Sequence, residues 1–312
     1  MGSNCSCYVA PGDSKIEDCD MIFHQDFLLK SKILPNLNQS SYLQENCESC
    51  NEKVKATESK LGPFSYGLGE TSPESDCYPV FSTEGWVYIG QVNLSGKKLG
   101  KGVYIWPDGS KYTGFWDNDK ANGRGRLIHA DGDVYEGEWV DDKAHGQGKY
   151  LHSDGAWYEG EWQLDLQHGI GEEHWTDGSI FKGRYIKGLR NGNGEFCWPD
   201  KSSYKGEFYQ GKIQGVGTYS WPDGRSYTGE WNDQKKHGKG KMVWSDGRVY
   251  EGEYLNDKRH GFGKLLWANG NFYEGFWNNG KKHGTGKTYI SGTITVSEWR
   301  DNQQIQNENY IV

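Results

Sequence analysis

The chain has 312 residues, a net charge of −8 and 45 glycines, about twice the usual glycine content. Aromatic residues reach 14%, with 14 Trp and 20 Tyr. Flat rings can pack against bare glycine backbone, whereas the Leu, Ile and Val that fill a deep core are few. This composition disfavours a helical bundle and predicts a thin β-structure.

The charge is distributed unevenly. Residues 1–86 contain 6 Lys and Arg against 13 Asp and Glu, whereas residues 87–299 contain 28 of each kind. Nonspecific nucleic-acid binding requires a net basic surface, so nucleic acid is not an expected partner. The seven Cys do not form a disulfide pattern, and no secretory segment or stretch of 18 apolar residues is present. We therefore expect a cytoplasmic protein.

The chain begins with the sequence MGSNCSC, which fits the N-myristoylation pattern with Gly2 as the acceptor. Cys5 and Cys7 are then candidate palmitoylation sites, because a second acyl chain makes membrane anchoring stable. The alternative is that Met-Gly-Ser is a cloning scar or an accident of sequence. The hypothesis places the N-terminus on the cytoplasmic face of a membrane.

Residues 1–62 are interpreted as an N-terminal extension. It is expected to be mostly disordered from residue 8 onward, with a short amphipathic segment around Met21–Ile33. The pair Cys47 and Cys50 has no second pair at zinc-binding spacing, so no metal site is expected there. Residues 63–86 contain several aromatic residues and are predicted to form an N-terminal cap.

From Val87 to Trp299 the sequence consists of nine copies of one unit of about 23 residues. An aromatic residue followed two positions later by glycine marks each copy: Tyr88, Tyr112, Tyr135, Tyr158, Phe181, Tyr204, Tyr227, Tyr250 and Tyr273. Such recurrence indicates a repeat protein. Residues 300–312 are interpreted as a C-terminal tail.

Within the third repeat, residues alternate with period two on both sides of a polar loop, which predicts two short strands. Aligning Gly137 with Gly148 places Glu136 opposite Lys149. The same register pairs opposite charges in other repeats: Glu251 with Lys264, Glu274 with Lys287, Glu230 with Lys239, and Lys182 with Glu195. These pairs predict an antiparallel hairpin in this register.

Asp-Gly or Asn-Gly ends most repeats and tolerates the positive φ angles of a tight turn, whereas Asp200-Lys201 predicts a looser turn. Paired strand glycines leave a slot in which a neighbouring ring is expected to lie flat. A second row of rings supports this packing: Trp106, Trp175, Trp198, Trp221, Trp244 and Trp267, with His129 and His152 in the same place in repeats two and three.

The unit Tyr-x-Gly-x-Trp, then Asn/His-Gly-x-Gly, then Asp-Gly resembles the MORN (membrane occupation and recognition nexus) repeat; residues 135–139 and 158–162 match its most typical opening. The resemblance implies an all-β fold, an elongated single-layer antiparallel sheet of stacked β-hairpins after a largely irregular N-terminal extension. It also implies a scaffold of the kind found at membranes, cytoskeletal rings, ciliary axonemes or junctions. Val92 replaces the usual Trp in the first repeat, which indicates an imperfect edge repeat.

The rings along the array are the predicted partner-binding residues, in a groove that would hold a helix or peptide of a protein partner. They are Tyr135, Trp139, Tyr158, Trp162, Tyr227, Trp231, Trp244, Tyr250, Trp267, Tyr273 and Trp277. The array cations are interpreted as solvated loop residues, with anionic lipid head groups as the alternative. They are Lys97, Lys98, Lys101, Lys235, Lys236, Lys239, Lys241, Lys258, Arg259, Lys281 and Lys282.

One histidine per repeat precedes the second strand's first glycine: His145, His168, His237, His260 and His283. At one per repeat they would lie about 10 Å apart, too far to share a metal ion. They are interpreted as making loop-closing hydrogen bonds. No metal site is expected.

No nucleophile–base arrangement, paired catalytic carboxylates or phosphate-binding loop stands out, and residues 1–86 are too few and too polar to form an enzyme domain. The sequence predicts no enzymatic activity and no cofactor. The predicted function is a scaffold for protein–protein interactions, near a membrane and anchored through an acylated N-terminus. The alternatives are a structural component of a ciliary axoneme or cytoskeletal assembly, and a targeting or regulatory subunit of a separate enzyme such as a phosphoinositide kinase.

Overall fold

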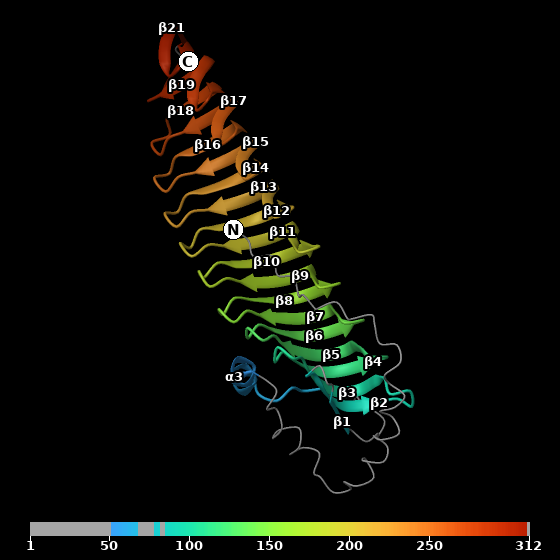
Figure 1. Cartoon of the computed structure of the whole chain (residues 1–312). Coiled ribbons are helices and arrows are strands. Elements are labelled where there is room, and N and C mark those ends of the chain that lie inside the picture. The colour runs from blue at the N-terminus through green and yellow to red at the C-terminus, as the bar shows by residue number, and fades with distance from the viewer. Residues whose placement is uncertain (1–50, 68–77, 82–84, 311–312) are drawn as a thin grey trace. The chain divides into compact units, whose positions relative to one another are not determined.

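The computed structural model describes residues 51–67, 78–81 and 85–310, and the chain divides at Gly169 into two parts, which are described separately. In each part, antiparallel strands follow one another in chain order (Figure 1). The predicted all-β fold of stacked hairpins is confirmed. Among the described residues the exception is one helix, α3 (Glu52–Leu61).

The hairpins of the N-terminal part pair consecutively from β1 to β8. Their strands are β1 (Tyr78–Phe81), β2 (Val87–Val92), β3 (Lys98–Ile105), β4 (Lys111–Asp117), β5 (Lys120–Ile128), β6 (Val134–Val140), β7 (Lys143–Leu151) and β8 (Trp157–Gln163). Strand β9 (Leu166–His174) contains the division point.

The C-terminal part continues the same pairing from β10 to β21. Its strands are β10 (Ile180–Ile186), β11 (Leu189–Cys197), β12 (Ser203–Tyr209), β13 (Lys212–Ser220), β14 (Ser226–Asn232), β15 (Lys235–Val243), β16 (Val249–Leu255), β17 (Lys258–Leu266), β18 (Phe272–Asn278), β19 (Lys281–Ile290), β20 (Thr293–Arg300) and β21 (Gln303–Tyr310). Strands β20 and β21 form a further hairpin, and β21 lies within residues 300–312, which were interpreted as a C-terminal tail.

The predicted hairpin register is confirmed by the pairing of Gly137 with Gly148 and of Glu136 with Lys149. A bulge follows the glycine pair, so that Glu230 lies opposite His237, and the predicted pairing of Glu230 with Lys239 is wrong. The ion pairs themselves connect successive hairpins, because the Lys149 ammonium lies 2.9 Å from a Glu159 carboxylate oxygen. Ion pairs between charged strand residues therefore link successive repeats.

Two kinds of turn alternate along the array. The tip of the third hairpin is a two-residue turn in which Asp141 and Asp142 both have positive φ angles, 50° and 65°. The Asp-Gly turn between repeats needs a positive φ at glycine alone, as at Gly155. Lys201 adopts φ 69° and donates its N–H to the Trp198 carbonyl oxygen at 2.9 Å, so the predicted looser turn is wrong.

Helix α3 lies in the segment that was expected to be mostly disordered. Asn51 begins it, accepting the Val54 N–H at its side-chain oxygen, and Gly62 ends it with a φ of 75°. Val54 is fully buried against an apolar cluster made of Val87, Ile105, Ile128 and Val134. The predicted segment at Met21–Ile33 lies outside the described residues, as do Gly2, Cys5, Cys7, Cys47 and Cys50.

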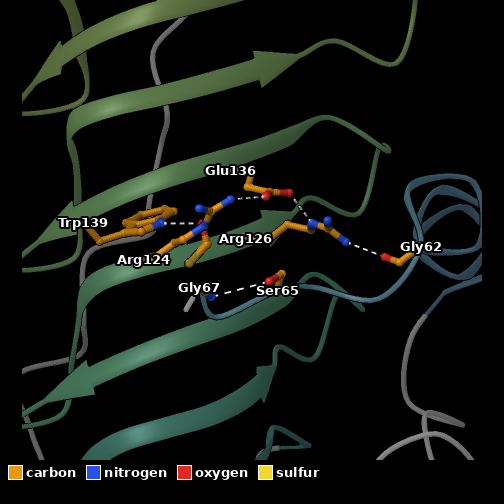
Figure 2. Close-up of polar contacts among 8 residues, drawn as sticks. Gly62, Ser65, Gly67, Arg124, Arg126, Glu136 and Trp139 are labelled. Carbon is orange, nitrogen blue, oxygen red and sulfur yellow. Dashed lines mark hydrogen bonds and ion pairs between the residues drawn. The ribbon is translucent and has the colours of Figure 1, made fainter. Parts of the chain in front are cut away.

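Polar contacts hold α3 and the residues after it against the first repeats. The Lys111 ammonium lies 2.7 Å from a Glu58 carboxylate oxygen. The Arg126 guanidinium donates to Glu136 and to the Gly62 carbonyl oxygen, each at 2.7 Å (Figure 2). The N-terminal covering therefore begins earlier in the chain than the cap predicted at residues 63–86.

Candidate protein-docking face

The aromatic residue that opens each repeat is buried on its own glycine pair. The Tyr135 side chain is 0% exposed, and its hydroxyl donates to the Glu138 carbonyl oxygen at 3.0 Å. A Cβ atom built on Gly148 would lie 2.6 Å from Cζ of Tyr135, so only glycine leaves room for the ring. We call the side of the sheet that carries Tyr135 and its equivalents the ring face.

In five repeats, a tryptophan four positions later connects the repeat to the preceding one. The Trp139 indole donates to the Gly125 carbonyl oxygen at 3.1 Å (Figure 2). Its ring meets Tyr112 and Tyr135 edge-on, at centroid distances of 5.3 and 5.0 Å. This bond runs backward in the chain to the preceding repeat, and the first repeat has Val92 at the tryptophan position.

Most of the predicted groove residues form the floor of the ring face, because their side chains are at most 7% exposed. These are Tyr135, Trp139, Tyr158, Trp162, Tyr227, Trp231, Tyr250, Tyr273 and Trp277. Trp244 and Trp267 are partly exposed instead. They belong to the second row of rings, which includes Trp175, Trp198 and Trp221 in the same part of the chain. On the ring face, this row offers a partner partly exposed aromatic rings.

One strand position places cations beside this row. It lies two residues before the first glycine of each hairpin's second strand, and it is occupied in chain order by Lys98, Ala121, Ala144, Gln167, Arg190, Ile213, Lys236, Arg259 and Lys282. In the last three repeats the cation lies directly across the strand pair from a ring: Trp231 faces Lys236, Tyr254 faces Arg259, and Trp277 faces Lys282.

The last three of these cations lie over aromatic rings. The Lys236 ammonium is 5.5 Å from the Trp221 ring centroid, the Arg259 guanidinium 4.0 Å from that of Trp277, and the Lys282 ammonium 4.3 Å from that of Trp299. The sequence interpretation treated them as loop cations. The hairpin tips are shorter than predicted, so these residues lie within strands and project onto the ring face.

Lys236, Arg259 and Lys282 have no carboxylate within ion-pair distance among the residues that the structure describes. Arg259 donates to the Gly280 carbonyl oxygen at 3.0 Å. Burial lowers the pKa of Lys236, Arg259 and Lys282. A neighbouring arginine adds to this effect, while Asp257 opposes it at Lys236, and Tyr250 and Tyr254 oppose it at Arg259. Lys236, Arg259 and Lys282 therefore form a half-buried, positively charged strip over the aromatic rings of the ring face.

The predicted loop-closing hydrogen bond is not made by the Nδ1 atoms of His145, His168, His237 and His283, which are buried with no hydrogen-bond partner among the described residues. The histidine backbone accepts a hydrogen bond instead, since the Tyr135 hydroxyl lies 3.3 Å from the His145 carbonyl oxygen. Within the described ranges, no three His, Cys, Asp or Glu side chains are grouped to hold a metal ion. The same ranges contain no helix long and apolar enough to cross a membrane.

The MORN-repeat family model matches residues 88–111, 112–134, 135–157, 158–180, 181–203, 204–224, 227–247, 250–272 and 273–293. The chain belongs to the MORN-repeat family. MORN-repeat proteins are generally non-catalytic repeat scaffolds. The nine matches coincide with the nine predicted repeats, and the hairpin β20–β21 follows the last of them.

No curated protein matches the chain. Among solved structures, the TCP domain of Drosophila melanogaster SAS-4 in complex with a proline-rich motif of Ana2 shows 13% identity and a TM-score of 0.31, covering 58% of this chain and 96% of that one. The TCP10c domain of Drosophila melanogaster Sas-4 shows 13% identity and a TM-score of 0.28, covering 65% and 100%. These TM-scores mean that the backbones superpose only in part.

Proposed function

We propose that this MORN-repeat protein is a non-enzymatic scaffold whose ring face docks a protein partner, and that an acylated N-terminus holds it at the cytoplasmic face of a membrane. The observation that carries the docking role is the row of partly exposed tryptophans on the ring face, which recurs in five successive repeats from Trp175 to Trp267. Tryptophan is enriched among the residues that dominate protein–protein binding energy.

The way the row is built favours docking. Backbone hydrogen bonds close each turn below its tryptophan, as where the Gly247 N–H donates to the Trp244 carbonyl oxygen at 3.0 Å. Arg248 stacks on the Trp244 ring, with its guanidinium 5.3 Å from the ring centroid. Rings held in place before binding lose little conformational freedom on binding, which favours affinity.

The docking role predicts that Trp221→His, Trp244→His and Trp267→His together abolish partner capture. Histidine occupies the same place at His129 and His152, so we expect the triple variant to fold. Tagged full-length wild type and variant would be compared by pulldown and mass spectrometry from cells of the source organism. Proteins recovered by the wild type and lost with the triple variant are the expected partners.

A variant on the opposite face of the sheet provides the control. Phe272→Ser removes a partly buried ring there, and Ser203 and Ser226 occupy the equivalent positions in other repeats. This variant should retain every partner. Equal recovery by all three proteins would contradict docking on the ring face. Recovery mainly of axonemal or cytoskeletal proteins, or of a lipid kinase, would favour the alternative assemblies.

The anchoring role rests on the pattern at Gly2, with Cys5 and Cys7 as candidate palmitoylation sites. A myristate analogue should label the wild type and leave Gly2→Ala unlabelled, and the variant should move from the membrane to the soluble fraction. Cys5→Ser with Cys7→Ser should keep the myristate label but release the protein from the membrane. An unlabelled wild type, or a labelled Gly2→Ala variant, would rule out the anchor.

A further inference from the structure

We infer that the strip of Lys236, Arg259 and Lys282 on the ring face binds an acidic, extended segment of a partner protein, with carboxylates that repeat about every 10 Å. This inference rests on the proposed docking function and specifies the chemistry of the partner. Three features of the strip carry it: cations without counter-ions, their spacing, and their position over rings.

The first feature is the excess of positive charge in the last repeats. The stacked guanidiniums of Arg225 and Arg248 are neutralised by Asp223 and Asp246, at 2.7 and 2.8 Å. The strip cations receive no such carboxylate from the described residues. Asp257 lies near Lys236, but its side chain accepts the backbone N–H of that residue at 3.0 Å. An anion placed over the strip would supply the missing partner.

Like charges also lie close to each other along the strip. After burial, the neighbouring Arg259 is the next cause that disfavours the charged form of Lys282. Arg225 and Arg248 act in the same direction on Lys236 and Arg259, but less strongly than the opposing effects of Asp257 on Lys236 and of Tyr250 and Tyr254 on Arg259. Charge-assisted hydrogen bonds to half-buried cations are stronger than those in open solvent. A bound carboxylate would therefore relieve both the repulsion and part of the desolvation.

The second feature is spacing. Successive strip cations are separated by one hairpin, two strands at about 4.8 Å each, or roughly 9.6 Å. A polyproline II segment rises about 3.1 Å per residue with three residues per turn, so every third side chain falls on one side at about 9.3 Å. In a β-strand, residues three apart point to opposite faces. Acidic residues at every third position of a polyproline II segment therefore match the strip.

The third feature favours a peptide over other anionic partners. Single-stranded nucleic acid is held by stacking of bases on open ring faces, but here the cations themselves cover the rings. Cations that bind a lipid surface must project from the protein to reach the head groups. The strip cations are partly buried, whereas the adjacent tip residues Lys235, Lys258 and Lys281 are exposed. An extended peptide with regularly spaced carboxylates is narrow enough to contact these partly buried cations.

The test uses the full-length chain and a synthetic peptide of three Glu-Pro-Pro units at low salt. Titration calorimetry should detect binding, and the combined Lys236→Ala, Arg259→Ala and Lys282→Ala variant should raise the Kd about tenfold or more. Alanine is the natural residue at this position in Ala121 and Ala144, which are buried, so the variant should keep its fold. A circular dichroism melt would verify this.

A matched control removes the same charge from the opposite face: Lys241→Ala, Lys264→Ala and Lys287→Ala should leave peptide affinity within about twofold. A peptide of Lys-Pro-Pro units should not bind, and one with its three glutamates adjacent should bind more weakly. Absence of binding, equal loss in both triple variants, or a strip dependence seen only with phosphatidylserine vesicles would overturn the inference. Partner loss in the tryptophan variant would still support the scaffold, so the two failures are distinguishable.

Discussion

Replacing Gly263 by alanine is expected to lower the free energy of unfolding of its hairpin by about 3 kcal/mol, the upper range for overpacking a core. A Cβ atom there would lie 2.6 Å from Cζ of Tyr250, and the nearest atoms are all in that one ring. Tyr250 is fully buried, so its ring has nowhere to move. Hydrogen exchange of residues 249–266, with urea unfolding of the whole chain, would measure the loss.

Two controls isolate the collision between Cβ and ring. Gly270 has a φ of 83° and open space around it, so Gly270→Ala should cost about 1 kcal/mol, the strain of a left-handed backbone alone. In a Tyr250→Ala background, Gly263→Ala should cost well under 1 kcal/mol, because the ring it would strike is gone. If the cost were the same in both backgrounds, the ring would not be the reason for the glycine.

Trp139→Ala is expected to destabilise the N-terminal part by about 3–5 kcal/mol, because it removes a large buried ring together with a hydrogen bond to the preceding repeat. The Trp139 side chain is 2% exposed and donates to the Gly125 carbonyl oxygen. The loss should spread to the preceding hairpin, since the ring touches Tyr112 there as well as Tyr135 in its own hairpin. Chemical unfolding followed by tyrosine and tryptophan fluorescence would measure it.

Trp139→Phe separates the ring from its hydrogen bond. Phenylalanine occupies this place at Phe208, which is 5% exposed and keeps the edge-on contacts with Phe181 and Tyr204. The substitution should therefore cost only about 1 kcal/mol, the value of one hydrogen bond and a smaller ring. A loss as large as that of the alanine variant would show that the hydrogen bond holds the repeats together rather than the packing.

The hairpins were predictable because their signals are local and repeated. Aromatic residue, glycine and opposite charge recur at fixed positions, so the pairing of Glu136 with Lys149 could be derived from spacing alone. The bulge after the glycine pair was not predicted, since the two-residue tip at Asp141-Asp142 is set by left-handed backbone angles that aspartate adopts less readily than glycine. That error shifted Glu230 from Lys239 to His237.

Helix α3 and the cation strip escaped prediction for different reasons. The helix offers a single buried residue, Val54, so its apolar periodicity is weak, and its stability comes from docking on the sheet. The strip residues were noticed as cations, but the face that Arg259 occupies depends on the length of the hairpin tip. Arg259 lies an even four residues before Gly263, so both are on the ring face, but this alternation could be used only once the strand was known to extend back to Lys258.

The contacts between repeats have a direction. The Trp139 indole bonds to Gly125, and both the Asp142 backbone N–H and its carboxylate bond to Ala121, so each hairpin depends on the one before it. A chain leaving the ribosome presents its N-terminal repeats first, and every new hairpin then meets hydrogen-bond partners that are already folded. This order of folding suits an array whose first hairpins pack on helix α3. Loss of the first hairpins would therefore destabilise the remaining hairpins more than loss of the last ones.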